Sequence, residues 1–230
     1  MSWVLANLGL IGSQLGAHLL QALPPILASF VLAIPLARLA ARASWLRGVV
    51  GVGSGLLYAI PSLPLFIVLP ILLGTGIRSI TNVIIALTLY GLALMVPGAI
   101  SAFASVGRDA LASATAQGYA PAARFWQVEL PLAGPALLAT LRVVAVSTVS
   151  LVTVGGVLGV PSLGMLFVDG FQRGILAEIL TGVALTAALA LVLDALLVAA
   201  GRVLMPWTRA GAGDAGTGGV EAGTAAEASA

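Results

Sequence analysis

Residues 108–131, RDALASATAQGYAPAARFWQVELP, form the longest polar stretch inside an otherwise apolar chain. Its first part, Asp109 to Gln117, is rich in Ala and Leu and predicts a helix. Gly118 ends that helix, and Pro121 is placed to open a second short one, since proline is tolerated in a first helical turn. The stretch closes at Val128-Glu129-Leu130-Pro131, where a new apolar run begins. We expect a helix–Gly–helix hairpin at one membrane face, suited to docking on a partner.

The composition around this hairpin is that of an integral membrane protein. Of the 230 residues, 60% are hydrophobic and 8% are charged, and the mean hydropathy is +1.13. An average soluble domain carries about 25% charged residues. The absence of cysteine excludes disulfides and thiolate metal sites. All basic residues are arginines, and they are scattered at the ends of apolar runs, which excludes a nucleic-acid patch.

Five apolar runs are long enough to cross a bilayer, for which a helix needs about 20 residues. They cover residues 17–36, 49–73, 80–105, 132–158 and 175–204. The second run carries Pro61, Pro64 and Pro70, and prolines free backbone carbonyls that need other partners within a membrane. The predicted fold is all-α: about five transmembrane helices with the hairpin attached.

The runs divide the chain into three parts. Residues 1–16 are expected to form an outer, interfacial N-terminal segment, and residues 17–207 form the transmembrane domain. Residues 208–230 are rich in Gly, Ala, Thr and Glu and predict a disordered tail.

The distribution of arginines predicts the orientation. Seven arginines fall at one face of the predicted bundle: Arg38, Arg42, Arg47, Arg108, Arg124, Arg202 and Arg209. The other face receives only Arg78 and Arg173. Because short cytoplasmic loops are enriched in basic residues, the hairpin and the C-terminus are expected inside the cell and the N-terminus outside.

The hairpin resembles the cytoplasmic signature of permease subunits of ATP-binding cassette (ABC) importers, the MetI-like superfamily. That pattern reads Glu-Ala-Ala, three residues, Gly, nine residues, then Ile-x-Leu-Pro. Here Ala112-Ser113-Ala114, Gly118 and Val128-Glu129-Leu130-Pro131 meet the spacing in full. Ala112 stands where the family has Glu, and Ser113 replaces the first Ala.

Other segments resemble the glycine betaine, carnitine and choline branch of these permeases. They are Gly55–Leu63, Ala86–Leu92, Leu141–Ala145 and Gly159–Gly164. The chain departs from that branch at Pro161-Ser162, where Gly-Gly is usual, and at Met95–Ala99, which replaces a polar Arg-Asn-Thr run.

The resemblance implies a subunit that moves a compatible solute across the cell membrane without hydrolysing ATP itself. It implies two copies of an ABC ATPase subunit docked on the hairpins, a second permease copy or paralogue, and an extracytoplasmic solute-binding protein. The sequence contains no Ser/His/Asp set, metal-ligand cluster or G-x-x-x-x-G-K-[ST] phosphate loop, so neither a catalytic site nor a cofactor is expected.

Three alternatives remain open at this point, of which one is a purely structural membrane subunit. The solute could be an amino acid or a betaine-like thiol compound carried by a related ABC permease. An ion-gradient-driven secondary transporter would instead show internal repeats and intramembrane carboxylates. The chain shows no clear repeat, and Asp194 is the one carboxylate deep in a span.

Two residue sets are candidates for functional roles within the spans. Tyr58, Pro61, Ser62 and Tyr90 are candidates for lining a translocation path, because aromatic faces attract quaternary ammonium ions, although packing is the commoner role of such rings. Arg142 and Asp194 lie roughly 16 and 15 Å from the same membrane edge at about 1.5 Å per helical residue. We therefore predict an ion pair between them, with separate hydration of the two charges as the alternative.

Overall fold

The computed structural model describes residues 2–41 and 43–208, and every regular element among them is helical. The helices in chain order are α1 (Ser2–Ala6), α2 (Leu8–Ala40), α3 (Ser44–Ala59), α4 (Ser62–Leu73), α5 (Ile80–Ala104), α6 (Arg108–Ala116), α7 (Pro121–Arg124), the π-helix η1 (Phe125–Glu129), α8 (Leu130–Gly155), the 3-10 helix η2 (Gly156–Leu158), α9 (Leu163–Arg173), α10 (Leu176–Leu204) and the 3-10 helix η3 (Pro206–Thr208).

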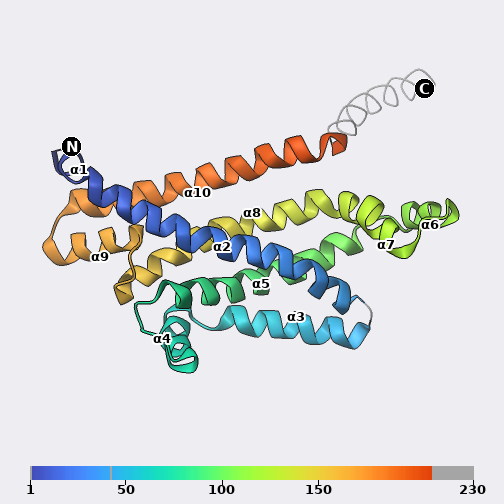
Figure 1. The fold of residues 1–230 in the computed structure, drawn as a ribbon, viewed down its shortest axis with the longest axis horizontal. Coiled ribbons are helices and arrows are strands. Elements are labelled where there is room, and N and C mark those ends of the chain that lie inside the picture. Colours follow the sequence, from blue (N-terminus) through green and yellow to red (C-terminus); the bar gives the residue numbers. More distant parts are fainter. Residues whose placement is uncertain (1, 42, 209–230) are drawn as a thin grey trace, which may run out of the picture.

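The centre of the bundle consists of α2, α5 and α8, which pack on one another (Figure 1). On one side α3 packs against α5, and on the other α10 packs against α8 and α9. The hairpin α6–α7 projects from one end of the bundle, and α4 and α9 lie toward the other end (Figure 1).

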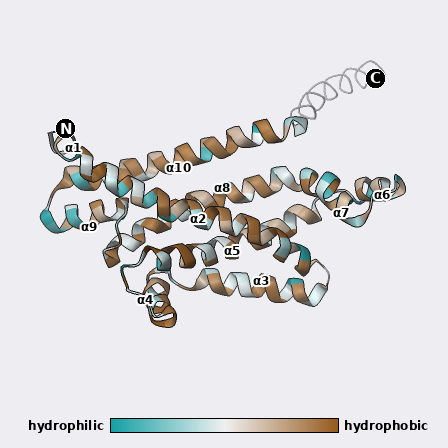
Figure 2. Cartoon of the chain, in the orientation of Figure 1, coloured by the Kyte–Doolittle hydropathy of each residue, from teal (hydrophilic) through white to brown (hydrophobic). Residues whose placement is uncertain are grey.

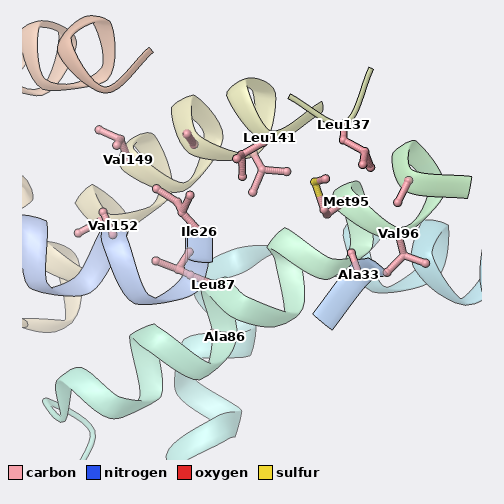
Figure 3. Close-up of a cluster of buried hydrophobic side chains, with 14 of the residues drawn as sticks. Ile26, Ala33, Ala86, Leu87, Met95, Val96, Leu137, Leu141, Val149 and Val152 are labelled. Atoms are coloured by element: carbon pink, nitrogen blue, oxygen red, sulfur yellow. The ribbon is translucent and has the colours of Figure 1, made fainter. Parts of the chain in front are cut away.

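Small residues let the central helices approach closely. The buried cluster in Figure 3 joins Ile26 and Ala33 of α2 to side chains of α5 and α8. A Cβ at Gly91 of α5 would lie 2.7 Å from the Ser29 side chain of α2, and one at Gly98 would overlap Thr140 of α8. Because lipid tails are as apolar as leucine, helices in a membrane associate by such close packing rather than by a hydrophobic driving force.

The outer helices expose their apolar side chains. No residue of α3 is buried, and in α10 only Glu178, Gly182 and Gly201 are. The exposed surface of these helices is nonetheless hydrophobic (Figure 2). By length and composition, four helices of the described residues are able to span a membrane, Leu8–Ala40, Ile80–Ala104, Pro121–Leu158 and Leu176–Leu204, and the bent pair α3–α4 provides a fifth span if counted as one. These features confirm the predicted all-α membrane fold.

Several predicted boundaries differ from the structure. The second predicted span, residues 49–73, is divided between two helices, α3 and α4, that meet at 100°. The helix α3 ends before Pro61, and the extended backbone at Ile60 and Pro61 turns the chain into α4. The boundary expected at residue 16 falls inside α2, which is continuous from Leu8. The segment between the fourth and fifth predicted spans, residues 159–174, contains the helix α9. The predicted tail lies outside the described residues except for Thr208.

The antiparallel order of the helices sorts the described arginines between the two ends. Arg38 lies in the last turn of α2 and Arg202 in the last turn of α10, both at the end from which the hairpin projects (Figure 1). Arg78, between α4 and α5, and Arg173, at the end of α9, lie at the opposite end.

Candidate functional site

The hairpin has the local geometry that its sequence predicts. Gly118 follows α6 with φ +84°, in the left-handed region that glycine reaches without steric cost. Its N–H donates to the Thr115 carbonyl at 3.0 Å, and the N–H of Tyr119 donates to the Ala114 carbonyl at 3.1 Å. These two bonds form a Schellman cap, which satisfies carbonyls at the end of the helix and reverses the chain sharply.

The two arms of the hairpin are tied together, and the outer surface of its first arm is open. Arg124 of α7 donates from Nη1 to the Thr115 hydroxyl of α6 at 2.9 Å. Ala114 is buried between the arms, while Ala112 and Ser113 are exposed. Val128, Leu130 and Pro131 lie in the half-buried segment where the second arm joins α8.

A π-helical turn, η1, connects the hairpin to α8 without a break. The Leu130 N–H donates to the carbonyl of Phe125, five residues back. Pro131 accounts for the wide turn, because it has no N–H to offer the Gln127 carbonyl and its ring would clash with that carbonyl in a regular α-helix. The predicted second arm and the predicted fourth span are therefore one continuous helix.

A second feature is the bend between α3 and α4. Ile60 and Pro61 both adopt extended backbone angles, as expected for a residue preceding proline and for a proline outside a helix. Pro64 has no N–H for the Ile60 carbonyl, four residues back. The Tyr90 hydroxyl of α5 donates to that carbonyl instead. Tyr90 thus satisfies a backbone group that the prolines leave without an intrahelical partner.

The four candidate path residues gather around this bend but differ in exposure. Tyr90 is 4% exposed, and its ring makes an edge contact with that of Tyr58, at 6.3 Å between centroids. Tyr58 is 49% exposed. Pro61 is exposed and Ser62 is half-buried. Only Tyr58 of the two tyrosines presents an open ring surface.

The structure places Arg142 of α8 beside Asp194 of α10. Arg142 donates from Nε to Asp194 Oδ1 at 2.6 Å and from Nη2 to Oδ2 at 2.8 Å, a bidentate arrangement. The two side chains are 42% and 26% exposed and border a groove of about 520 Å³ between the two helices. The groove is otherwise lined by small and apolar residues and Ser147. Charged side chains within membrane spans are typically turned toward protein or a water-filled cavity.

The sequence analysis did not predict the ion pair between Arg38 at the end of α2 and Glu129 of η1. Arg38 Nη1 donates to Glu129 Oε2 at 2.8 Å, and its guanidinium carbon lies 4.0 Å from the centre of the Phe125 ring. The sequence offered one indication of this pair. Charged residues are scarce in the chain, so a charged side chain near the end of a span is a candidate for pairing with another. In the described residues, no group of three or more metal-ligating side chains could hold a metal ion.

The chain is similar to a known protein family and to individual proteins. Residues 33–210 match the family described as "Binding-protein-dependent transport system inner membrane component". The chain is 28% identical to the osmoprotectant import permease protein OsmW of Salmonella typhimurium, over 89% of this chain and 96% of that protein. It is 30% identical to the glycine betaine/carnitine/choline transport system permease protein OpuCD of Bacillus subtilis, over 88% of this chain and 91% of the relative.

The fold has a counterpart among solved structures. A chain of the MetNI methionine ABC transporter in an inward-facing conformation matches with a TM-score of 0.70 and 20% identity. The match covers 87% of this chain and 97% of that one. At this identity the match shows a shared fold.

Proposed function

This chain belongs to the family of binding-protein-dependent transport system inner membrane components, and we propose that it moves a compatible solute, such as glycine betaine, choline or a related quaternary amine. It is the multi-pass permease subunit of an ABC importer, a transport component rather than an enzyme. ATP hydrolysis belongs to a separate subunit.

The observation that carries the choice of solute is the likeness, over about nine tenths of the chain, to permeases named for osmoprotectants and for glycine betaine, carnitine and choline. The exposed ring of Tyr58 supports the same class, because aromatic faces attract quaternary ammonium groups. Tyr58, Pro61 and Ser62 line the path in this proposal, and Tyr90 holds the bend that presents them.

The proposed assembly contains two copies of the ATPase subunit, a second permease that is a copy or a paralogue, and a solute-binding protein at the outer face. The hairpin and the C-terminus face the cytoplasm, and the N-terminus faces outward. The arginines at the hairpin end of the bundle support this orientation.

The hairpin is the proposed docking element for the ATPase. The exposed Ala112 and Ser113 and the capped turn at Gly118 form its contact surface. When two ATPase subunits close on ATP, they draw the hairpins of the two permeases together. Because the second arm continues into α8 through η1, that movement passes to the transmembrane helices.

The experiment that tests the solute uses a bacterial strain lacking its own importers. The permease is expressed there with its ATPase and binding protein, and uptake of labelled glycine betaine, choline and proline is measured beside that of an anionic solute and a sugar. Uptake of betaine or choline supports the proposal. Robust transport of the sugar or the anion, with none of betaine or choline, contradicts it.

A further inference from the structure

One arginine contacts both the first and the last residue of the π-helical turn that joins the hairpin to the bundle. Arg38, in the last turn of α2, bonds Glu129, the last residue of η1, and lies over the ring of Phe125, the first. Glu129 lies 91 residues beyond Arg38 in the sequence, and both Phe125 and Glu129 belong to a different helix from Arg38. The contacts are therefore tertiary.

Other side chains also join the hairpin to the helices behind it, among them Leu111 of α6, which packs against the buried cluster of the bundle. α6 packs mainly on α7 and η1, whereas η1 packs on α6, α7 and α8. Phe103 at the end of α5 adds a ring contact with Phe125, at 5.7 Å between centroids. The side chains of Arg38 and Phe103 therefore connect two central helices to the segment through which the hairpin is attached.

The chemistry of this contact allows α2 and η1 to change their relative angle while Arg38 stays bound to both Phe125 and Glu129. A guanidinium is planar, carries a permanent charge and is able to stack on an aromatic ring while donating to a carboxylate. Glu129 is 15% exposed and Arg38 is 38% exposed, so the pair lies at the edge of the bundle. A small cavity of about 280 Å³, which Ala41 and Leu111 also line, leaves open space beside the pair.

We propose that Arg38 is a positioning residue that makes α2 follow the coupling hairpin. The proposal rests on the function given above, in which the hairpin receives the movement of the ATPase. Through the covalent chain, that movement reaches α8 directly and α5 through the short link at residues 105–107. α2 has no covalent link to the hairpin and otherwise follows it only by packing on α5 and α8, and the contact of Arg38 with Phe125 and Glu129 joins its end to the hairpin segment directly.

A simple structural tie would give a different result from a coupling contact. If the Arg38 contact only stabilises the fold, its loss lowers the amount of assembled complex, and each complex that remains transports solute normally. Loss of a coupling contact leaves assembled complexes that hydrolyse ATP but move less solute per ATP. The ratio of solute moved to ATP hydrolysed separates the two cases, because unfolded protein contributes to neither number.

The experiment measures this ratio in proteoliposomes containing the complete complex, with glycine betaine or choline as the solute. We expect Arg38→Met and Glu129→Gln to lower the ratio about fivefold or more, the lower end of typical coupling effects. Arg38→Lys keeps the charge but not the planar stacking group and should be intermediate. The reversed pair, Arg38→Glu with Glu129→Arg, restores the ion pair but not the stacking on Phe125 and should recover part of the ratio. A normal ratio in both single variants overturns the inference.

Arg47→Met is the matched control. Arg47 lies in the first turns of α3, near the same end of the bundle, is exposed and makes no ion pair within residues 2–41 and 43–208. Its substitution should leave the ratio unchanged, and an equal loss in this variant also contradicts the inference. A wild-type complex that hydrolyses ATP without moving solute contradicts the proposed function itself, and the inference with it.

A second measurement follows the movement directly. The chain has no cysteine of its own. Cysteines introduced at Leu39 of α2 and Asp109 of α6 are therefore the only sites in the chain that a thiol-reactive spin label modifies. In the wild-type complex the distance between the labels should stay constant between the nucleotide-free and ATP-trapped states. In Arg38→Met it should change or broaden. An equally constant distance in the variant overturns the inference.

Discussion

Tyr90 illustrates how one hydroxyl stabilises a sharp bend in a membrane helix. The two prolines after Ile60 leave its carbonyl without an intrahelical donor, so within a membrane span it needs another partner. Tyr90 reaches it from α5, thirty residues further along the chain. The sequence could predict that the carbonyl needs a partner, but it could not identify the partner, because the approach of α3 to α5 is set by tertiary packing.

Replacement of Tyr90 by Phe should destabilise the permease by about 0.5–1.5 kcal/mol, the usual net contribution of one intramolecular hydrogen bond. The measurement is the thermal unfolding midpoint of the purified protein in detergent. Tyr119→Phe is the control, since Tyr119 is 37% exposed on the hairpin. Equal midpoints for the Tyr90 variant and the wild type would show that the bond contributes nothing to stability.

The Arg142–Asp194 pair should behave as a unit. We expect Arg142→Met and Asp194→Leu each to lower the yield of folded protein several-fold, because either change leaves a single charge within the membrane. The double variant should recover much of the yield, since removing both partners leaves no unpaired charge. Yields are measured by fluorescence-detected size-exclusion chromatography.

The exposed pair Arg173–Asp169 on α9 provides the comparison for this cycle. Exposed pairs contribute little, so Arg173→Met should leave the yield unchanged. Additive losses in the Arg142/Asp194 double variant would mean that the two side chains act independently. The depth of the two residues gave a reason to pair them from sequence, because they sit on successive antiparallel spans. Arg38 and Glu129 had no such relation in sequence.

At the scale of elements, local signals predicted best where they act within one helix. The Ala-rich run before Gly118 predicts α6, and α5 and α10 begin and end within one residue of their predicted bounds. Prediction was poorer where packing decides. The prolines after Ile60 indicated a kink but not a 100° bend. The helix α9 lies among glycines and is stabilised by packing on α10, where Gly170 lets Ile179 approach.

Gly118→Val should uncouple transport from ATP hydrolysis while leaving insertion into the membrane intact. Valine at φ +84° is strained by about 1–2 kcal/mol, so the hairpin turn should open or distort. ATP hydrolysis and solute uptake are measured together in the reconstituted complex. Gly48→Val is the control near the same end of the bundle, because Gly48 is an exposed residue of α3 with open space around its Cα and is not in the left-handed region. Transport by the Gly118 variant at the wild-type level would exclude a rigid docking role for the turn.

At the scale of the whole molecule, the arrangement of arginines predicts which end faces the cytoplasm. Cysteines introduced singly at Gly118 and Gly76 mark the two ends of the bundle, and both positions have open space around them. On intact cells, an impermeant thiol reagent should label Gly76→Cys and not Gly118→Cys, and both should react once the membrane is permeabilised. The reverse pattern on intact cells would invert the orientation.

The central claim is that this chain transports solute only as part of an ATP-driven complex. The most direct measurement is accumulation of labelled glycine betaine or choline in proteoliposomes that contain the permease, its ATPase and its binding protein. Accumulation should require ATP and all three components, and it should persist when ion gradients are abolished by ionophores. Accumulation that proceeds without the ATPase and collapses with the ion gradient would contradict the account and identify a secondary transporter.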